Sequence, residues 1–263
     1  SKAVTLDAGT GAITDGNGDS NNVIAHSLTT TSQGGVGVGN ALEVVLSDSF
    51  SFTETGAGGI ELMNTSFATL TIDGETSGGD ITIQQAGAGG TLTLGACKTN
   101  PCGDPDDADV SSNGGAISVR ADKISSLGGN INLGDGLITL DGDSPSGNIV
   151  LGPDGFQTSF FTDLKSSNGL TIGSLSHTGT ITVTDVIETT KLTGGVFSLL
   201  SNNNITIADG ANITSSTPIT VQSTSGNIQV NAELKAKEGD IYLQAILGDV
   251  AFGAGAGLDS EKG

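Results

Sequence analysis

The chain of 263 residues has no tryptophan, one tyrosine, one methionine and one arginine. Charged residues make up 14% of it, against roughly 25% in an average soluble protein. No segment has the ~18 consecutive apolar residues of a membrane-spanning helix. A formal net charge of −20 with a single arginine disfavours nucleic acid and anionic membranes as partners. We therefore expect no nucleic-acid binding and no membrane insertion.

Glycine is abundant, with 42 residues, and lacks the strict every-third-residue period of a collagen. Apolar residues reach 35%, which is too many for an acidic disordered tail. No charge block or proline-rich linker divides the chain. These features indicate an all-β protein whose residues 1–263 form a single segment.

A short phrase recurs along the chain: a glycine, often followed by Asn or Asp, and then alternating β-branched and polar residues. Such alternation, bounded by turn residues, is typical of strands. Instances are 79–83 (GDITI), 115–119 (GAISV), 147–151 (GNIVL), 179–183 (GTITV), 226–230 (GNIQV) and 239–243 (GDIYL).

The spacing of equivalent apolar residues is 21 or 22, as between Ile60 and Ile81, Leu70 and Leu92, Ile149 and Leu170, Ile219 and Ile241, and Ile228 and Val250. This period predicts a parallel β-helix of about 12 coils, with equivalent residues stacked about 4.8 Å apart. An antiparallel sandwich also has closely spaced strands and is the alternative, although it requires no such register. In the β-helix, we expect glycine to supply positive φ at the corners and stacked Asn to form amide ladders.

Two segments depart from the period and are predicted to be inserted loops: residues 96–113 and residues 152–168, which include Phe156, Phe160 and Phe161. Residues 1–76 are less regular than the repeats of 77–252. Insertions in repeat proteins map to loops and often carry binding sites. We expect loop 96–113 to be the first candidate binding site and loop 152–168 the second.

The phrases SGGDITIQ (77–84), GGNINLGDGLITLDG (128–142) and TSGNIQVNAELKAKEGDIYLQA (224–245) resemble filamentous haemagglutinin-type repeats. These repeats occur in large exoproteins and adhesins of bacterial two-partner secretion systems. The resemblance implies a right-handed parallel β-helix, an extracellular or cell-surface location, and a role in adhesion or as a stalk. The partner that it implies is a host receptor or glycan.

Cys97 and Cys102 are the only cysteines, five residues apart. They can close a small disulfide loop in an oxidising compartment; the alternative is two free thiols in a cytosolic protein. Next along the chain come Asp104, Asp106, Asp107 and Asp109, whose carboxylates suit Ca²⁺. The alternative is a solvated acidic loop, and no other cofactor is expected.

No catalytic residues are predicted, and we expect the protein not to be an enzyme. Arg120 and Lys123 are the only basic pair of the central coils, fewer cations than a β-helical lyase needs for a polyanionic substrate. Asp106 and Asp107 resemble the acid pair of polysaccharide hydrolases, but no His-Gly or Arg-x-Lys accompanies them. His177 is interpreted as a surface or corner residue.

These observations predict a structural and adhesive module of a secreted bacterial protein. The alternatives are a subunit of a self-assembling extracellular fibre and a β-helical polysaccharide lyase or hydrolase. Because neither end of the sequence shows a capping segment, the expected neighbours are adjoining coils of a longer chain or end-to-end copies.

Overall fold

The computed structural model describes residues 2–95, 108–126, 130–132 and 136–261. Contacts within the chain divide it into two units, Ser1–Gly136 and Leu137–Gly263. Each unit is a parallel β-solenoid, and together they hold about 11 turns, close to the predicted 12. The parallel pairing excludes the antiparallel sandwich.

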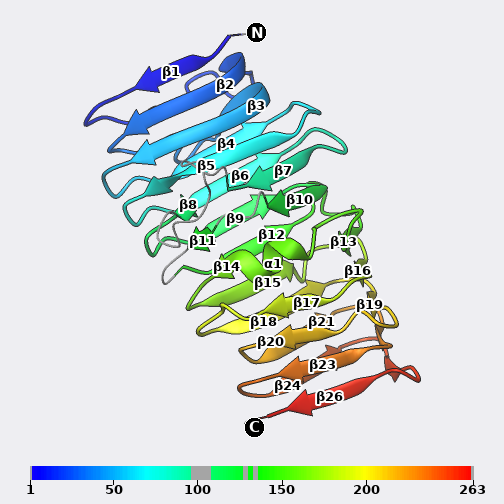
Figure 1. Cartoon of the computed structure of the whole chain (residues 1–263). Helices are drawn as coiled ribbons and strands as arrows, with labels where there is room; N and C mark the ends of the chain where they lie inside the picture. Colours follow the sequence, from blue (N-terminus) through cyan, green and yellow to red (C-terminus); the bar gives the residue numbers. More distant parts are fainter. Residues whose placement is uncertain (1, 96–107, 127–129, 133–135, 262–263) are drawn as a thin grey trace. The chain divides into compact units, whose positions relative to one another are not determined.

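In the first unit, strands stack in parallel from coil to coil, as Figure 1 shows for β1, β2, β3 and β5. The strands are β1 (Val4–Asp7), β2 (Val23–Ser32), β3 (Leu42–Glu54), β4 (Ile60–Asn64), β5 (Leu70–Thr76), β6 (Ile81–Gln85), β7 (Thr91–Leu94), β8 (Ala108–Ser111), β9 (Ile117–Arg120), β10 (Lys123–Ser126) and β11 (Asn130–Asn132). Strand β3 is long enough to pair with both β4 and β5. Residues 1–76, expected to be less regular, therefore form paired strands.

The core of the first unit consists of columns, which are sets of residues at the same position in successive coils. Leu28 pairs with Phe50 and Phe50 with Ile72, each at the predicted spacing of one coil, and all three are fully buried. The predicted pairs Ile60–Ile81 and Leu70–Leu92 are also confirmed. The coil between Ile81 and its partner Ile117 is longer, because it contains the segment that begins at residue 96.

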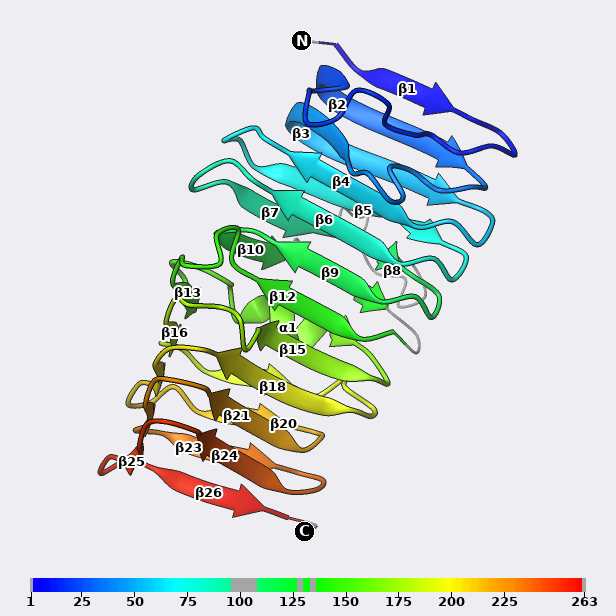
Figure 2. The ribbon, with the colours of Figure 1, turned by 180° about the vertical axis from the view of Figure 1, so that it is seen from behind.

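The second unit has three parallel ladders, which Figure 2 shows from behind. The strands are β12 (Ile138–Asp141), β13 (Ile149–Leu151), β14 (Leu164–Lys165), β15 (Gly169–Gly173), β16 (Ile181–Val183), β17 (Ile187–Thr189), β18 (Val196–Ser201), β19 (Ile205–Ile207), β20 (Ile213–Ser215), β21 (Ile219–Ser223), β22 (Ile228–Val230), β23 (Glu233–Ala236), β24 (Ile241–Ala245), β25 (Val250–Phe252) and β26 (Gly257–Ser260), with one helix, α1 (Ser159–Asp163). One ladder is β13–β16–β19–β22–β25 and another is β17–β20–β23–β26. In the first of these ladders one inward column stacks Ile149, Ile181, Ile205 and Ile228, and in the second Ile187 stacks on Ile213.

The predicted register of Ile149 on Leu170 is wrong. Ile149 pairs with Ile181 and Ile138 pairs with Leu170, so this coil is longer than the period predicts. The extra residues belong to the segment 152–168. The next coil is still long, with Leu170 paired to Phe197. The shorter period returns after it, and Ile219 pairs with Ile241 and Ile228 with Val250, as predicted.

The positive φ predicted for corner glycines occurs at Gly239 of the recurring phrase, whereas Gly79 and Gly179 have a different role. Gly79 and Gly179 do not have positive φ. A Cβ on Gly79 would lie 1.8 Å from the Gly58 carbonyl oxygen, and one on Gly179 would lie 1.8 Å from that of Gly147. Glycine is needed here because neighbouring coils approach too closely for any side chain.

Asn and Asp residues that stand just before a strand, at the corner, cap the next coil. Their side-chain oxygens accept hydrogen bonds from the backbone N–H of the equivalent residue one coil on. Asn204 accepts from Asn227, and Asn227 accepts from Asp249, at 2.8 and 2.9 Å. Each cap satisfies an N–H at a corner, where the strand ladder does not. An amide-to-amide contact, as predicted for the ladders, occurs between the buried Asn64 and Gln85.

Candidate functional site

Most of the predicted site residues lie outside the described part of the chain. Cys97, Cys102, Asp104, Asp106 and Asp107 all fall in residues 96–107. The disulfide and the calcium site in this segment stay predictions. Within the described residues, no group of three or more His, Cys, Asp or Glu side chains is placed to hold a metal ion.

The end of the predicted loop 96–113 is not a loop. Residues Ala108–Ser111 form β8, which pairs with β5 and β11 in the sheet of the first unit, and Asp109 lies on this strand. The alternation of Ala108 and Val110 with polar residues was too short to indicate a strand beside an acidic run. Any inserted loop therefore ends before residue 108.

The second predicted loop, 152–168, is partly internal. It contains α1 and β14, and Phe156, Phe160 and Phe161 are all at most 1% exposed. Phe160 and Phe161 contact each other edge to face, with ring centroids 5.6 Å apart. Helix α1 packs near β17, within the same unit. The aromatic side chains stabilise the fold and are not presented for binding.

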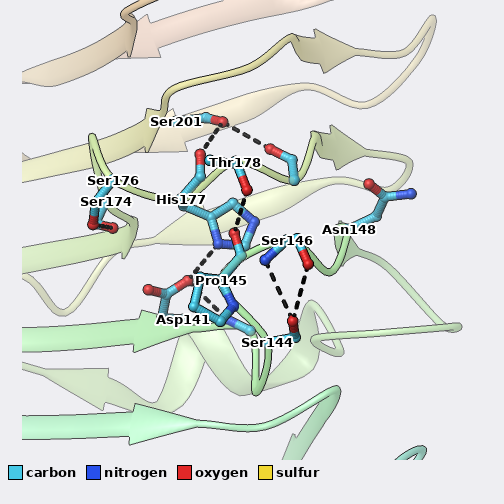
Figure 3. Close-up of polar contacts among 12 residues, drawn as sticks. Asp141, Ser144, Pro145, Ser146, Asn148, Ser174, Ser176, His177, Thr178 and Ser201 are labelled. Carbon is cyan, nitrogen blue, oxygen red and sulfur yellow. Dashed lines mark hydrogen bonds and ion pairs between the residues drawn. The ribbon is translucent and has the colours of Figure 1, made fainter.

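The sequence analysis interpreted His177 as a surface or corner residue, but its side chain is buried. Nδ1 of the imidazole lies 2.9 Å from an oxygen of Asp141, one coil earlier (Figure 3). The imidazole is fully buried, whereas the carboxylate is 19% exposed. The contact lacks the direction of a hydrogen bond, and neither ring nitrogen has a hydrogen-bonding partner. The carboxylate also accepts a hydrogen bond from the N–H of Gly142.

This His–Asp pair lacks the arrangement of a hydrolytic triad. Ser201 lies near the imidazole, but its hydroxyl donates to the backbone carbonyls of His177 and Gly179, at 3.2 and 2.9 Å. Because the ring is fully buried, no substrate can reach Nε2. The chemistry open to the pair is electrostatic attraction between the two loops that carry it.

The two loops present an exposed polar surface above the buried pair. Thr178 N–H donates to the carbonyl of Pro145 at 2.7 Å, which joins the loops directly. The hydroxyls of Ser144 and Ser146 lie 3.2 Å apart, and those of Ser174 and Ser176 lie 3.0 Å apart. We call this surface the corner hydroxyl patch; its members are Ser144, Ser146, Asn148, Ser174, Ser176 and Thr178 (Figure 3). All except the half-buried Ser174 are exposed.

The corner hydroxyl patch is rigid because each loop is tied to its neighbours in the stack. The Asn148 side-chain oxygen accepts from both the N–H and the hydroxyl of Thr180, at 3.1 and 3.0 Å. Asn202 N–H donates to the carbonyl of His177 at 2.8 Å. Such an array offers hydrogen-bond donors and acceptors at fixed spacing, which suits recognition of a polyhydroxylated ligand.

None of the described helices is long and apolar enough to span a membrane. The chain matches no family model, no curated protein and no solved structure.

Proposed function

We propose that the chain is a structural and adhesive module of a secreted or surface-displayed bacterial protein. The corner hydroxyl patch carries the proposal, because it joins an exposed set of hydrogen-bonding side chains to a stack of coils. The resemblance to filamentous haemagglutinin-type repeats supports the same function and location. In this mechanism the coils supply rigidity and the patch supplies contact with a host receptor or glycan.

Rigidity matters because a surface that is already ordered loses little conformational entropy on binding. In the patch, backbone hydrogen bonds between loops and the buried His177–Asp141 contact hold the exposed side chains in place. The serine side chains are short, so they lose few rotamers on binding. A weak individual contact with a sugar hydroxyl then adds to its neighbours along the same corner.

The test is an attachment assay on glycan arrays and on cells, using the purified chain. The variant replaces Ser144, Ser146, Ser174 and Ser176 together by Ala. We expect a severalfold loss of attachment with an unchanged unfolding midpoint. The control replaces Ser47 and Ser225, exposed serines elsewhere, by Ala and should bind like the unmodified chain. Equal attachment of both variants would remove the patch from the proposal.

The fibre-subunit alternative is favoured by the last coil of the second unit. Among the described residues, β24, β25 and β26 each pair on one side only, with β21, β22 and β23. Phe252 and Leu258 are at least half exposed, as is Tyr242. An unpaired strand edge with apolar side chains is a template for another strand. Light scattering across a concentration series tests this: growth of filaments supports a fibre subunit, and a constant monomer mass contradicts it.

A further inference from the structure

The segment between β1 and β2 contains an incomplete calcium-loop pattern. Residues 15–20 read DGNGDS, which places Asp15, Asn17 and Asp19 at the alternating positions of the first three ligands of an EF-hand loop. The sixth position is Ser20 instead of glycine, and no glutamate stands at the twelfth. The pattern alone therefore does not make a site, and a further carboxylate would have to come from another part of the chain.

Oxygen atoms converge in this segment. One carboxylate oxygen of Asp15 accepts from the N–H of Asn17 at 2.9 Å and from the side chain of Asn22 at 2.6 Å. These hydrogen bonds lower the pKa of Asp15, so its carboxyl is ionised at neutral pH. One terminal atom of the Asn17 amide lies 2.7 Å from Asp15 Oδ1, 2.9 Å from the Ser20 carbonyl and 3.1 Å from the Gly18 carbonyl. With the amide nitrogen in this position, the Asn17 side chain donates hydrogen bonds to these oxygens.

Glu43, on the adjacent coil, supplies an independent sign of a cation. Its side chain is only 6% exposed, yet Oε2 has no hydrogen-bonding partner. A buried carboxylate without a partner is costly, and a bound cation removes that cost. The orientation of the Asn17 amide does not affect this observation, because the oxygen without a partner belongs to Glu43.

Strand register places Glu43 against the segment. Asn22 N–H donates to the Glu43 carbonyl at 2.7 Å, and Glu43 N–H donates to the Asn22 side chain at 2.9 Å. The neighbours Leu42 and Val44 point into the core, so the Glu43 side chain points outward.

Two further contacts join the segment to the coil that carries Glu43 and to the coil beyond it. Asn21 accepts from the Thr65 hydroxyl at 3.4 Å, and Thr65 belongs to the coil beyond the one that carries Glu43. The side chain of Asn40, three residues before Glu43, donates to the second oxygen of Asp15. These contacts hold the loop against the coil that carries Glu43 and against the coil beyond it.

We propose that the loop 15–22 and Glu43 bind one Ca²⁺ ion. The side chains of Asp15, Asn17 and Glu43 and the carbonyls of Gly18 and Ser20 supply oxygen ligands, and water completes the 6–8 that Ca²⁺ takes. The proposed site contains only two carboxylates, and its other ligands are neutral oxygens. This agrees with the finding that no three Asp, Glu, His or Cys side chains converge in the described residues. The ion ties the loop to the next coil.

The test is calorimetric titration of CaCl₂ into the whole chain after dialysis against a chelator. The variants are Asp15→Asn and Glu43→Gln, with Glu75→Gln as the control, because Glu75 is an exposed carboxylate in the same unit. We expect the affinity of this site to fall at least about tenfold in both variants and to stay unchanged in the control. Residues 104–109 are predicted to form a separate Ca²⁺ site, so only the difference from the unmodified chain reports on the site of Glu43.

Thermal unfolding gives a second readout that separates binding from simple damage. In chelator, Glu43→Gln should raise the unfolding midpoint, since it removes the buried carboxylate whose Oε2 has no partner. In Ca²⁺ the order should reverse, because only the unmodified chain gains stability from the ion. If Glu43→Gln does not fold, Asp15→Asn and the exposed variant Asn17→Ala decide. Calcium titrations identical to that of the unmodified chain, or a midpoint order that Ca²⁺ does not change, would overturn the proposal.

Discussion

The hydroxyl of Ser32 donates a 2.7 Å hydrogen bond to the carboxylate of Glu54, which occupies the same corner position one coil later. Glu54 is 1% exposed and also accepts from the N–H groups of Gly35 and Gly56, at 3.2 and 2.7 Å. Thr76 continues the column, with its hydroxyl donating to the Gly79 carbonyl at 2.6 Å. Buried side chains thus satisfy corner groups that the strand ladders leave open.

Replacing Glu54 by Gln should destabilise the first unit. All three partners of the carboxylate are donors, so the amide NH₂ would face donors in place of one oxygen. We expect a loss of about 1–3 kcal/mol, the cost of buried hydrogen-bonding groups left without partners. Chemical denaturation measures it, with Glu75→Gln as the exposed control, which should change stability little. An equal effect of the two variants would show that the corner hydrogen bonds add nothing.

The Gly179→Ala variant tests the close approach of coils. Its Cβ would lie 1.8 Å from the Gly147 carbonyl oxygen, so the corner must open. We expect a loss of about 3 kcal/mol, at the upper end of overpacking effects. Gly147→Ala is the matched control, because its Cβ would meet nothing closer than 3.3 Å and its φ is not left-handed. Similar unfolding free energies for both variants would contradict the steric explanation.

The sequence could predict the stacked coils because inward apolar residues recur every 21 or 22 residues in coils that carry no insertion. Leu70 and Leu92 are partners at this regular spacing, as are Ile219 and Ile241. It could not predict the partner of Ile149, because a parallel ladder constrains the stacking of strands and leaves the length of the connection free. The periodicity shows that a register exists but does not say where an insertion shifts it.

The buried features of the corners were harder to predict, because they depend on residues distant in sequence. Helix α1 is only five residues long, too short for a helical period, and its aromatics were interpreted as part of a loop. His177 is flanked by polar residues and gives no local sign of burial. Asp141, its contact, lies a whole coil earlier in the chain, before the inserted segment. Only the stacking of coils brings the two together.

The Asn caps predict a local effect. In Asn204→Ala the N–H of Asn227 loses its 2.8 Å acceptor. Asn204 is exposed, so water can replace the oxygen, and we expect a cost of only about 0.5–1 kcal/mol. Hydrogen exchange at the Asn227 amide should become faster. Asn204→Asp keeps an acceptor and should preserve the protection; faster exchange in that variant as well would mean that the cap is not the cause.

His177 offers the sharpest test of what holds the corner hydroxyl patch. Its imidazole fills space between coils but makes no aligned hydrogen bond, and Asp141 keeps both the Gly142 N–H and access to water. A buried polar group without partners can be replaced by an apolar group of similar volume at little cost. We therefore expect His177→Leu to lie within about 1 kcal/mol of the unmodified chain, whereas His177→Ala should lose about 2–4 kcal/mol through its cavity.

Denaturation of the two His177 variants, with attachment measured in parallel, distinguishes packing from electrostatics. If packing dominates, His177→Leu keeps both stability and attachment, since the loops stay joined through Thr178 and Pro145. If the attraction between the imidazole and Asp141 dominates, Leu is as damaging as Ala, and Asp141→Asn reproduces the loss. The stability of His177→Leu relative to His177→Ala therefore decides whether the patch depends on the volume of this side chain or on its charge.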